Sequence, residues 1–332
     1  MRLRGIFGSL AILAACLGSP AHAADCSLKI VNSIPITLGA NGTRVLVPVI
    51  INGTKETFLL DTGGALTQIS ASAAHDLNLP IGESSVKMLD LYGAAAAGAV
   101  HVKTFTLGRL QDRETTLPLM TSTFKDEPYA GLLAADYMGE YDVEMDFSGG
   151  NINYFSRDHC EGKVIYWPAA AIAAVPFRLQ NYHLTLSVML DGRPIKAMID
   201  TGSPDTVLFS SAAKQAFGVT ADSPGAEKLG EEGGEKIFEY VFKNLSFEGL
   251  TVSNPHIAVS PDRTGSKDPN NGYVTGSRVH REDDADPTDP VMLIGMNILS
   301  KLHLYIAFNE HKIYITPAAA PAPAQPAATG QN

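Results

Sequence analysis

The feature that most constrains the fold is an internal repeat. The tripeptide Asp-Thr-Gly occurs at residues 61–63 and again at residues 200–202, which places the two copies 139 residues apart. Residues 47–79 align on residues 186–218 without a gap, so the duplication extends far beyond the tripeptide. The repeat predicts two related lobes, each built from one copy of the same unit. The pairs identical at this offset include Val49/Val188, Gly53/Gly192, Thr67/Thr206, Ser72/Ser211, Ala73/Ala212 and Ala74/Ala213.

Each copy predicts the same local structure. An apolar strand leads into Asn52-Gly53 or Asp191-Gly192, dipeptides that favour tight hairpin turns. A second apolar strand then runs directly into the aspartate, and a short Ala-rich helix follows. Serines near the start of each helix are candidate N-caps. They are Ser70 or Ser72 in the first half, and Ser210 or Ser211 in the second.

The repeat resumes near the end of each half, where residues 131–155 resemble residues 292–316. The offset is now 161 residues, so the second half carries about 22 additional residues. The stretch 261–290 accounts for them, because it is rich in Asp, Pro, Gly and Ser and is predicted to be an exposed loop. Within the later repeat, Leu293-Ile294-Gly295 and Asn297 in the second half correspond to Leu132-Leu133-Ala134 and Asp136 in the first.

Together these motifs resemble a two-lobed aspartic protease assembled from two retropepsin-like units, of the kind found in bacterial envelopes. The resemblance covers roughly residues 30 to 316. It implies a mostly β fold with two pseudo-symmetric acid-protease β-barrel lobes and an active-site cleft between them. The expected organisation is a signal peptide at 1–23, lobes at 24–160 and 161–316, and a disordered Pro/Ala tail at 317–332.

The resemblance also assigns roles to individual residues. Ala134 stands where the family has glycine, a departure that adds a methyl group to a closely packed segment. In the family each lobe contributes one Asp-Thr/Ser-Gly loop, and a tyrosine and glycine at the tip of a flap cover the substrate. Here the catalytic pair is Asp61 and Asp200, the supporting residues are Thr62, Gly63, Thr201, Gly202 and Ser203, and the flap candidates are Tyr92 and Gly93. The Ser203 hydroxyl is a candidate hydrogen-bond donor to Asp200, a role that Gly64 cannot fill with a side chain.

Two carboxyl groups are required because the reaction uses both protonation states. One carboxylate activates a water molecule while the other, protonated, donates to the scissile carbonyl. Carboxyl groups held a few ångström apart cannot both ionise easily, so they share a proton and titrate as a pair; aspartic-protease dyads are the standard example. The sequence does not distinguish the roles of Asp61 and Asp200.

Three functions are compatible with these motifs. The first is a monomeric aspartic endopeptidase acting on a peptide or protein substrate. The second is a catalytically weak protein that uses the same cleft to bind peptides or partners in the cell envelope. The third is a homodimer in which each Asp-Thr-Gly loop pairs with its counterpart in another chain. It ranks last, because two loops in one chain meet at high effective concentration.

Composition and the absence of other motifs argue against several other classes of function. The net charge of −10 and the pI near 5.3 argue against nucleic-acid binding, which needs clustered Lys and Arg. No run of 18 or more apolar residues follows the N-terminus, so no membrane span is predicted. The nine histidines show no paired-ligand spacing, and no nucleotide-binding glycine motif occurs. No metal or cofactor is therefore predicted.

The N-terminus predicts export from the cytoplasm. Residues 1–23 have a basic start, an apolar region and Ala21-His22-Ala23 as a cleavage site, the pattern of a signal peptide. The alternative is a lipoprotein anchored at Cys16, because residues 13–16 resemble a lipobox. Cleavage after Ala23 leaves Cys26 and Cys160, which flank the first lobe and are a candidate disulfide in an oxidising compartment. The predicted location is periplasmic or secreted.

Overall fold

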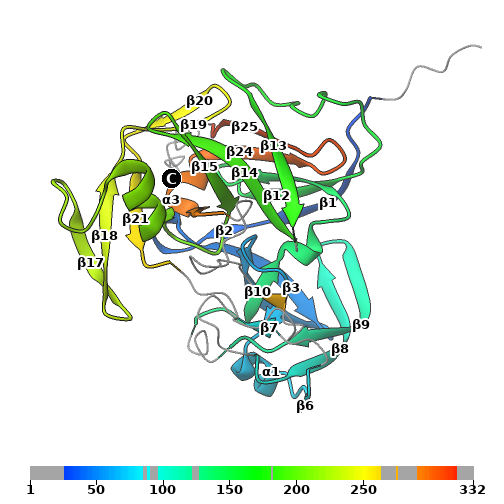
Figure 1. The fold of residues 1–332 in the computed structure, drawn as a ribbon. Helices are drawn as coiled ribbons and strands as arrows, with labels where there is room; N and C mark the ends of the chain where they lie inside the picture. The colour runs from blue at the N-terminus through cyan, green and yellow to red at the C-terminus, as the bar shows by residue number, and fades with distance from the viewer. Residues whose placement is uncertain are drawn as a thin grey trace, which may run out of the picture.

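The computed structural model describes residues 26–84, 88–89, 96–121, 127–180, 182–262, 274–275 and 290–319. Within these ranges the chain is mostly β, and its long strands lie in two sheets that together build two lobes (Figure 1). This confirms the fold class predicted from the repeat. A third, two-stranded sheet joins β7 (Met88–Leu89) in parallel to β22 (Val274–Thr275).

The first lobe is built on an eight-stranded sheet with the order β5-β10-β4-β3-β8-β6, in which β2 pairs with β3 and β9 pairs with β8. These strands occupy the lower part of Figure 1. Their bounds are β2 Thr37–Leu38, β3 Val45–Ile51, β4 Thr54–Asp61, β5 Gln68–Ile69, β6 Ile81–Gly82, β8 Ala99–Leu107, β9 Leu110–Pro118 and β10 Gly131–Ala134, and the helices are η1 Ala40–Gly42, α1 Ala71–Asp76 and η3 Ala135–Tyr137.

The second lobe repeats this plan inside the larger, fifteen-stranded sheet. A long hairpin formed by β17 and β18 projects from its side, at the left of Figure 1. The strands are β14 His183–Leu190, β15 Arg193–Ile199, β16 Val207–Phe209, β17 Glu227–Glu232, β18 Glu235–Val241, β19 Asn244–Phe247, β20 Leu250–Ser253, β21 His256–Ser260 and β23 Met292–Ile294, and the helices are α2 Ser210–Ala212, η4 Ala213–Phe217 and α3 Met296–Leu299.

The predicted hairpins form at the expected turns. Strands β3 and β4 are joined by Asn52 and Gly53, with φ of 50° and 88°, and β14 and β15 by Asp191 and Gly192, with φ of 45° and 77°. Two consecutive residues with positive φ define the type I′ turn, whose twist matches the strands that it joins. Both copies of the repeat therefore begin with the same hairpin.

Six strands from both halves form a continuous section of the larger sheet, in the order β1-β12-β11-β24-β25-β13. The two hairpins at the ends of the repeats meet edge to edge here, since β11 pairs antiparallel with β24. This pairing joins the lobes through backbone hydrogen bonds. The bounds are β1 Ile30–Pro35, β11 Asp142–Asp146, β12 Asn151–Phe155, β13 Ala173–Gln180, β24 Leu302–Ala307 and β25 Lys312–Pro317.

The structure joins Cys26 and Cys160 in a disulfide. The pairing of β1 with β12 brings together the segment before β1, which carries Cys26, and the segment after β12, which carries Cys160. The bond closes a segment of 134 residues that contains the whole first repeat. Such a crosslink restricts the unfolded chain and thereby favours the folded one.

The apolar segment Val164–Trp167 forms no strand; Val164 packs on the inter-lobe sheet, and the Trp167 indole donates to the Thr316 hydroxyl at 3.0 Å.

One of the two predicted helix caps is present and the other is not. Ser70 caps α1 by accepting from the Ala73 N–H at 3.1 Å, as predicted. Neither Ser210 nor Ser211 caps the second helix.

The start of the second helix is capped from outside the repeat. The Asp262 carboxylate accepts from the Ser211 N–H at 3.0 Å and from the Ser210 hydroxyl at 3.3 Å. A carboxylate also interacts favourably with the partial positive charge at a helix N-terminus. The repeat therefore keeps the serines but not the capping arrangement.

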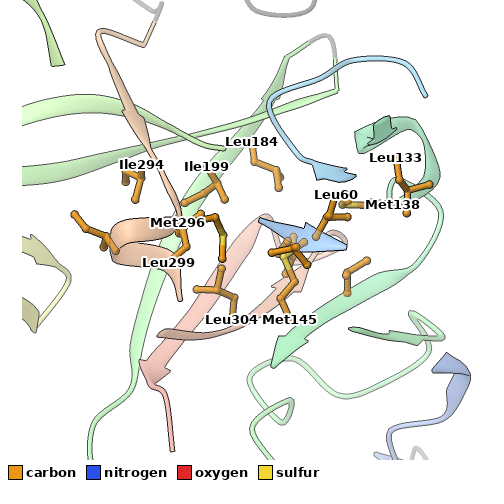
Figure 2. Close-up of a cluster of buried hydrophobic side chains, with 14 of the residues drawn as sticks. Leu60, Leu133, Met138, Met145, Leu184, Ile199, Ile294, Met296, Leu299 and Leu304 are labelled. Atoms are coloured by element: carbon orange, nitrogen blue, oxygen red, sulfur yellow. The ribbon is translucent and has the colours of Figure 1, made fainter. Parts of the chain in front are cut away.

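The hydrophobic core is continuous across the two lobes. Side chains from β4, β10 and β11 meet those from β14, β15, β23, α3 and β24 in one buried cluster (Figure 2). Leu60 and Ile199, which directly precede the two aspartates, both belong to it. Both Asp-Thr-Gly loops therefore rest on one packed base. None of the helices in the described ranges has the length and apolar character needed to cross a bilayer.

Candidate active site

The two Asp-Thr-Gly loops leave equivalent strands. Asp61 is the last residue of β4, which pairs in parallel with β10, so that Asp61 faces Ala134. Asp200 directly follows β15, which pairs in parallel with β23, and its N–H donates to the Ile294 carbonyl at 3.0 Å. Each loop is thus supported by the strand that carries the later repeat.

The threonines bind the loops to each other across the lobes. The Thr62 hydroxyl donates to the Ile199 carbonyl at 2.8 Å and accepts from the Thr201 N–H at 3.0 Å. The Thr201 hydroxyl donates to the Leu60 carbonyl at 2.9 Å and accepts from the Thr62 N–H at 3.1 Å. Both threonines are fully buried, so the four hydrogen bonds form where water cannot replace them. We call this set of four the threonine brace.

The glycines allow the carboxyl groups to approach. A Cβ atom on Gly202 would lie 2.4 Å from Oδ1 of Asp61 and 3.2 Å from Oδ1 of Asp200, so one methyl-sized position touches both carboxyls. A Cβ atom on Gly63 would lie 2.5 Å from Oδ1 of Asp200. Each glycine therefore packs against the aspartate of the opposite loop, and any side chain at either position would force the loops apart.

Backbone N–H groups hold both carboxyl groups. Oδ1 of Asp61 accepts from the Gly64 N–H at 2.9 Å, and Oδ1 of Asp200 accepts from the N–H groups of Gly202 at 3.0 Å and Ser203 at 3.1 Å. The Ser203 hydroxyl does not serve Asp200 as expected; it donates to the Asp205 carbonyl at 2.7 Å. Ser203 therefore contributes to the site through its backbone.

The Asp61 carboxyl is held in its protonated form to an unusually high pH. Burial is the largest cause, and the charge of the neighbouring Asp200 is the second; together they raise the pKa of Asp61 to about 7. The N–H groups of Gly64 and Gly63 act in the opposite direction, because they stabilise the carboxylate. Asp200 is 5% exposed, so neither carboxyl is freely hydrated. The two groups form a pair that can retain one proton near neutral pH.

Each loop is also supported by a second set of hydrogen bonds, one set in each lobe. The residues of these sets were given no role from the sequence. The Thr67 hydroxyl donates to Oδ1 of Asp136 at 2.7 Å and accepts from the Ala134 N–H at 3.0 Å, while the Thr67 N–H donates to Oδ2 of Asp136 at 2.9 Å. These contacts tie the end of the first loop to the strand that supports it.

The second lobe makes the equivalent set. The Thr206 hydroxyl donates to Oδ1 of Asn297 at 2.7 Å and accepts from the Gly295 N–H at 3.1 Å, and the Thr206 N–H donates to the same Oδ1 at 2.9 Å. The identity of Thr67 and Thr206, together with the acid or amide at Asp136 and Asn297, was the sequence signal that could have predicted both sets.

Two predicted site residues and one unpredicted residue complete the account. Tyr92 and Gly93, the flap candidates, lie outside the described residues.

Arg44, which the sequence analysis did not identify, reaches from the residue before β3 to the second loop. Its Nη1 donates to the Gly202 carbonyl at 3.0 Å. The positive charge of Arg44 therefore lies beside Gly202, the glycine that packs against the Asp61 carboxyl.

Comparison with known sequences identifies the family of the chain. The sequence model of the aspartyl protease family matches residues 47–137 and again residues 186–298, one match for each lobe. The chain therefore belongs to the aspartyl protease family. Among solved structures it is similar to basic 7S globulin from soybean, with 9% identity, a TM-score of 0.48, and coverage of 89% of this chain and 96% of that chain. No curated protein matches the chain.

Proposed function

We propose that the chain is an aspartic endopeptidase that hydrolyses peptide bonds with a water molecule activated between Asp61 and Asp200. The observation that carries the proposal is the contact of both carboxyl groups with Gly202, within loops joined by the threonine brace. Membership of the aspartyl protease family supports the same chemistry. The raised pKa of Asp61 supports a pair that holds one proton at the pH of the reaction.

The reaction uses the pair as acid and base at once. The ionised carboxyl accepts a proton as water attacks the scissile carbonyl, and the protonated carboxyl donates its proton to the carbonyl oxygen. The C–N bond of the resulting tetrahedral intermediate then breaks, and the amine leaves with a proton supplied by the pair. The backbone N–H groups at Gly64, Gly202 and Ser203 keep the carboxyl groups fixed throughout.

The proposed enzyme acts as a monomer on peptide or protein substrates. One chain supplies both aspartates, so no second copy is needed to complete the pair. We also propose that it acts in the periplasm or outside the cell. The predicted signal peptide supports this location, and so does the Cys26–Cys160 disulfide, since such bonds persist in oxidising compartments. Sedimentation of the active protein tests the monomer, and active dimers would contradict it.

The decisive experiment is cleavage of a diverse peptide library by the mature chain from pH 3 to 9. Asp61→Asn and Asp200→Asn are each expected to lower the cleavage rate by more than about 100-fold, because each removes one partner of the acid and base pair. Asp76→Asn is the matched control, since Asp76 is exposed on α1. Activity is expected to fall as the pH rises above about 7, where the pair loses its shared proton.

Two outcomes would contradict the proposal. One is a folded wild-type chain that cleaves nothing in the library, which would favour the peptide-binding alternative. The other is cleavage that survives in both Asn variants, which would place the activity elsewhere or in a contaminant.

A further inference from the structure

We propose that Arg44 makes the enzyme selective for substrates with an Asp or Glu side chain next to the scissile bond, on one side of that bond only. This inference rests on the proposed peptidase function and names its substrate class. It starts from a hydrogen bond that crosses between the lobes, from Nη1 of Arg44 to the carbonyl of Gly202.

The position of Arg44 is fixed at both ends. Its carbonyl accepts from the Gly39 N–H at 2.8 Å, directly before β3, and its guanidinium is held by the Gly202 carbonyl at 3.0 Å. The side chain is half-buried. A long side chain held at both ends has already lost much of its conformational freedom, so it can bind a ligand at a smaller entropic cost.

The guanidinium lies close to the reacting centre. Gly202 packs against the Asp61 carboxyl, and Arg44 binds the carbonyl of this same glycine. A substrate must place its scissile carbonyl beside the carboxyl pair. An extended peptide advances about 3.3 Å per residue, so side chains one or two residues from the scissile bond come within reach of the guanidinium.

The charge of Arg44 has no direct partner in the described part of the chain. Among the described residues, no carboxylate lies within 4.0 Å of its guanidinium. Glu127 instead accepts a hydrogen bond from Tyr129, whose pKa is raised first by burial and then by the charge of Glu127. A guanidinium presents five N–H donors in a planar fork that matches a carboxylate, and the Gly202 carbonyl uses one of them. A substrate carboxylate would occupy the remaining donors of this fork.

The repeat explains why the preference is one-sided. At the offset of 139 residues, the second lobe carries His183 where the first lobe carries Arg44. His183 is 4% exposed, so its imidazole is buried. Among the described residues, Arg44 is the arginine that donates to an Asp-Thr-Gly loop, and a peptide crossing the carboxyl pair meets its guanidinium in one half only.

The test compares cleavage specificity in four proteins: the wild type, Arg44→Gln, Arg44→Glu and the control Arg193→Gln, whose arginine is exposed on β15. The wild type is expected to prefer Asp or Glu over Asn or Gln by about tenfold or more at one position. Arg44→Gln removes the preference, Arg44→Glu reverses it towards Lys or Arg at the same position, and Arg193→Gln leaves it unchanged. A uniform loss of rate for all peptides in Arg44→Gln would overturn the proposal, because Arg44 would then only support the Gly202 carbonyl.

A binding measurement separates this inference from the proposed function. The mature Asp61→Asn chain is immobilised and offered two pools of capped random octapeptides, which differ only in having Glu or Gln at one fixed position. Preferential retention of the Glu pool, lost when Arg44→Gln is added, supports the role of Arg44 even if the wild type cleaves nothing. Equal retention of both pools at every fixed position overturns it, whatever the library experiment shows.

Discussion

The two Asp-Thr-Gly loops have the same backbone arrangement but different side chains around it. In the first loop, the Gly64 carbonyl accepts from the Ala135 N–H at 3.2 Å; in the second, the Ser203 carbonyl accepts from the Met296 N–H at 2.9 Å. The supporting side chain is an acid at Asp136 and an amide at Asn297.

The small residues are exchanged as well. The first lobe pairs Gly64 with Ala134, and a Cβ on Gly64 would lie 3.3 Å from the Ala134 methyl. The second lobe pairs Ser203 with Gly295, and a Cβ on Gly295 would lie 2.9 Å from the Ser203 carbonyl. In the first lobe a methyl group on the supporting strand thus faces a glycine in the loop, whereas in the second lobe a glycine on the supporting strand faces the loop backbone. The comparison teaches that the duplicated unit keeps one backbone arrangement with side chains of different volume and charge.

The largest expected loss of stability and activity comes from breaking the threonine brace, which both loops share. Thr62→Val or Thr201→Val removes a hydroxyl and leaves one buried carbonyl and one buried N–H without a partner, at a cost of roughly 2–5 kcal/mol. The two variants are expected to lose equal stability in urea unfolding and to lose most of their activity, because the contacts are equivalent. The Ser variants keep the hydroxyl and serve as controls. A Val variant as stable as the wild type would show that the threonine brace contributes nothing.

The next largest expected loss of stability tests the difference between the two supporting segments, which end in Ala134 in the first lobe and Gly295 in the second. A Cβ on Gly295 would lie 2.2 Å from the Asp205 carbonyl oxygen, a backbone atom that cannot move freely. Gly295→Ala is expected to cost about 3 kcal/mol, whereas Ala134→Gly costs about 1 kcal/mol or less. Thermal unfolding measures both, and Gly230→Ala is the control, since nothing lies within 4 Å of its Cβ position. Equal losses at Gly295 and Ala134 would contradict the claim that the two lobes pack differently.

A double variant tests the compensation directly. Gly64→Ser makes the first loop resemble the second, but its Cβ would lie 3.0 Å from Oδ2 of Asp61 and 3.3 Å from the Ala134 methyl. We expect a loss of about 1–2 kcal/mol and reduced activity. Adding Ala134→Gly is expected to restore about 0.5–1 kcal/mol, measured as the coupling energy of a double-mutant cycle. A coupling energy of zero would show that the Gly64 and Ala134 positions vary independently.

The sequence predicted most of this architecture because the repeat is local and nearly gapless. Strands, type I′ turns and the meeting of the two loops follow from residues 47–79 and 186–218. Two of the contacts that it missed involve partners with no counterpart in the repeat. Arg44 acts on a residue 158 positions away, and the second lobe has a histidine in its place. Asp262 caps a helix from beyond the end of the aligned segment.

The local character of the sequence signal also explains the wrong prediction of the cap on the second helix. Ser210 and Ser211 repeat the serines of the first lobe, yet the capping group comes from a distant strand end. The apolar run Val164–Trp167 has the composition of a strand but forms none, and Val164 packs on the face of the inter-lobe sheet. This outcome depends on tertiary structure and not on local pattern.

The smallest expected effect is on the pH dependence of stability, which should differ between the acid of the first lobe, Asp136, and the amide of the second, Asn297. Burial raises the pKa of Asp136, against the hydrogen bonds from Thr67 that lower it. An Asp whose pKa is raised by folding favours the folded state most at low pH, where it is protonated in both states. That contribution is lost as the pH rises from the unfolded pKa, near 4, through the folded one. Asn297 accepts the equivalent hydrogen bonds without titrating.

Asp136→Asn is therefore expected to flatten the dependence of thermal stability on pH. The melting temperature of the variant, relative to the wild type, should rise by a few degrees between pH 4 and pH 7. Asn297→Asp should do the opposite, because it places a titrating carboxyl where the amide was. Calorimetric scans of both variants and the wild type across this range measure the effect. If Asp136→Asn shifts the melting temperature by the same amount at every pH, the pKa of Asp136 does not change on folding, and the stability of the two lobes responds alike to pH despite their different residues.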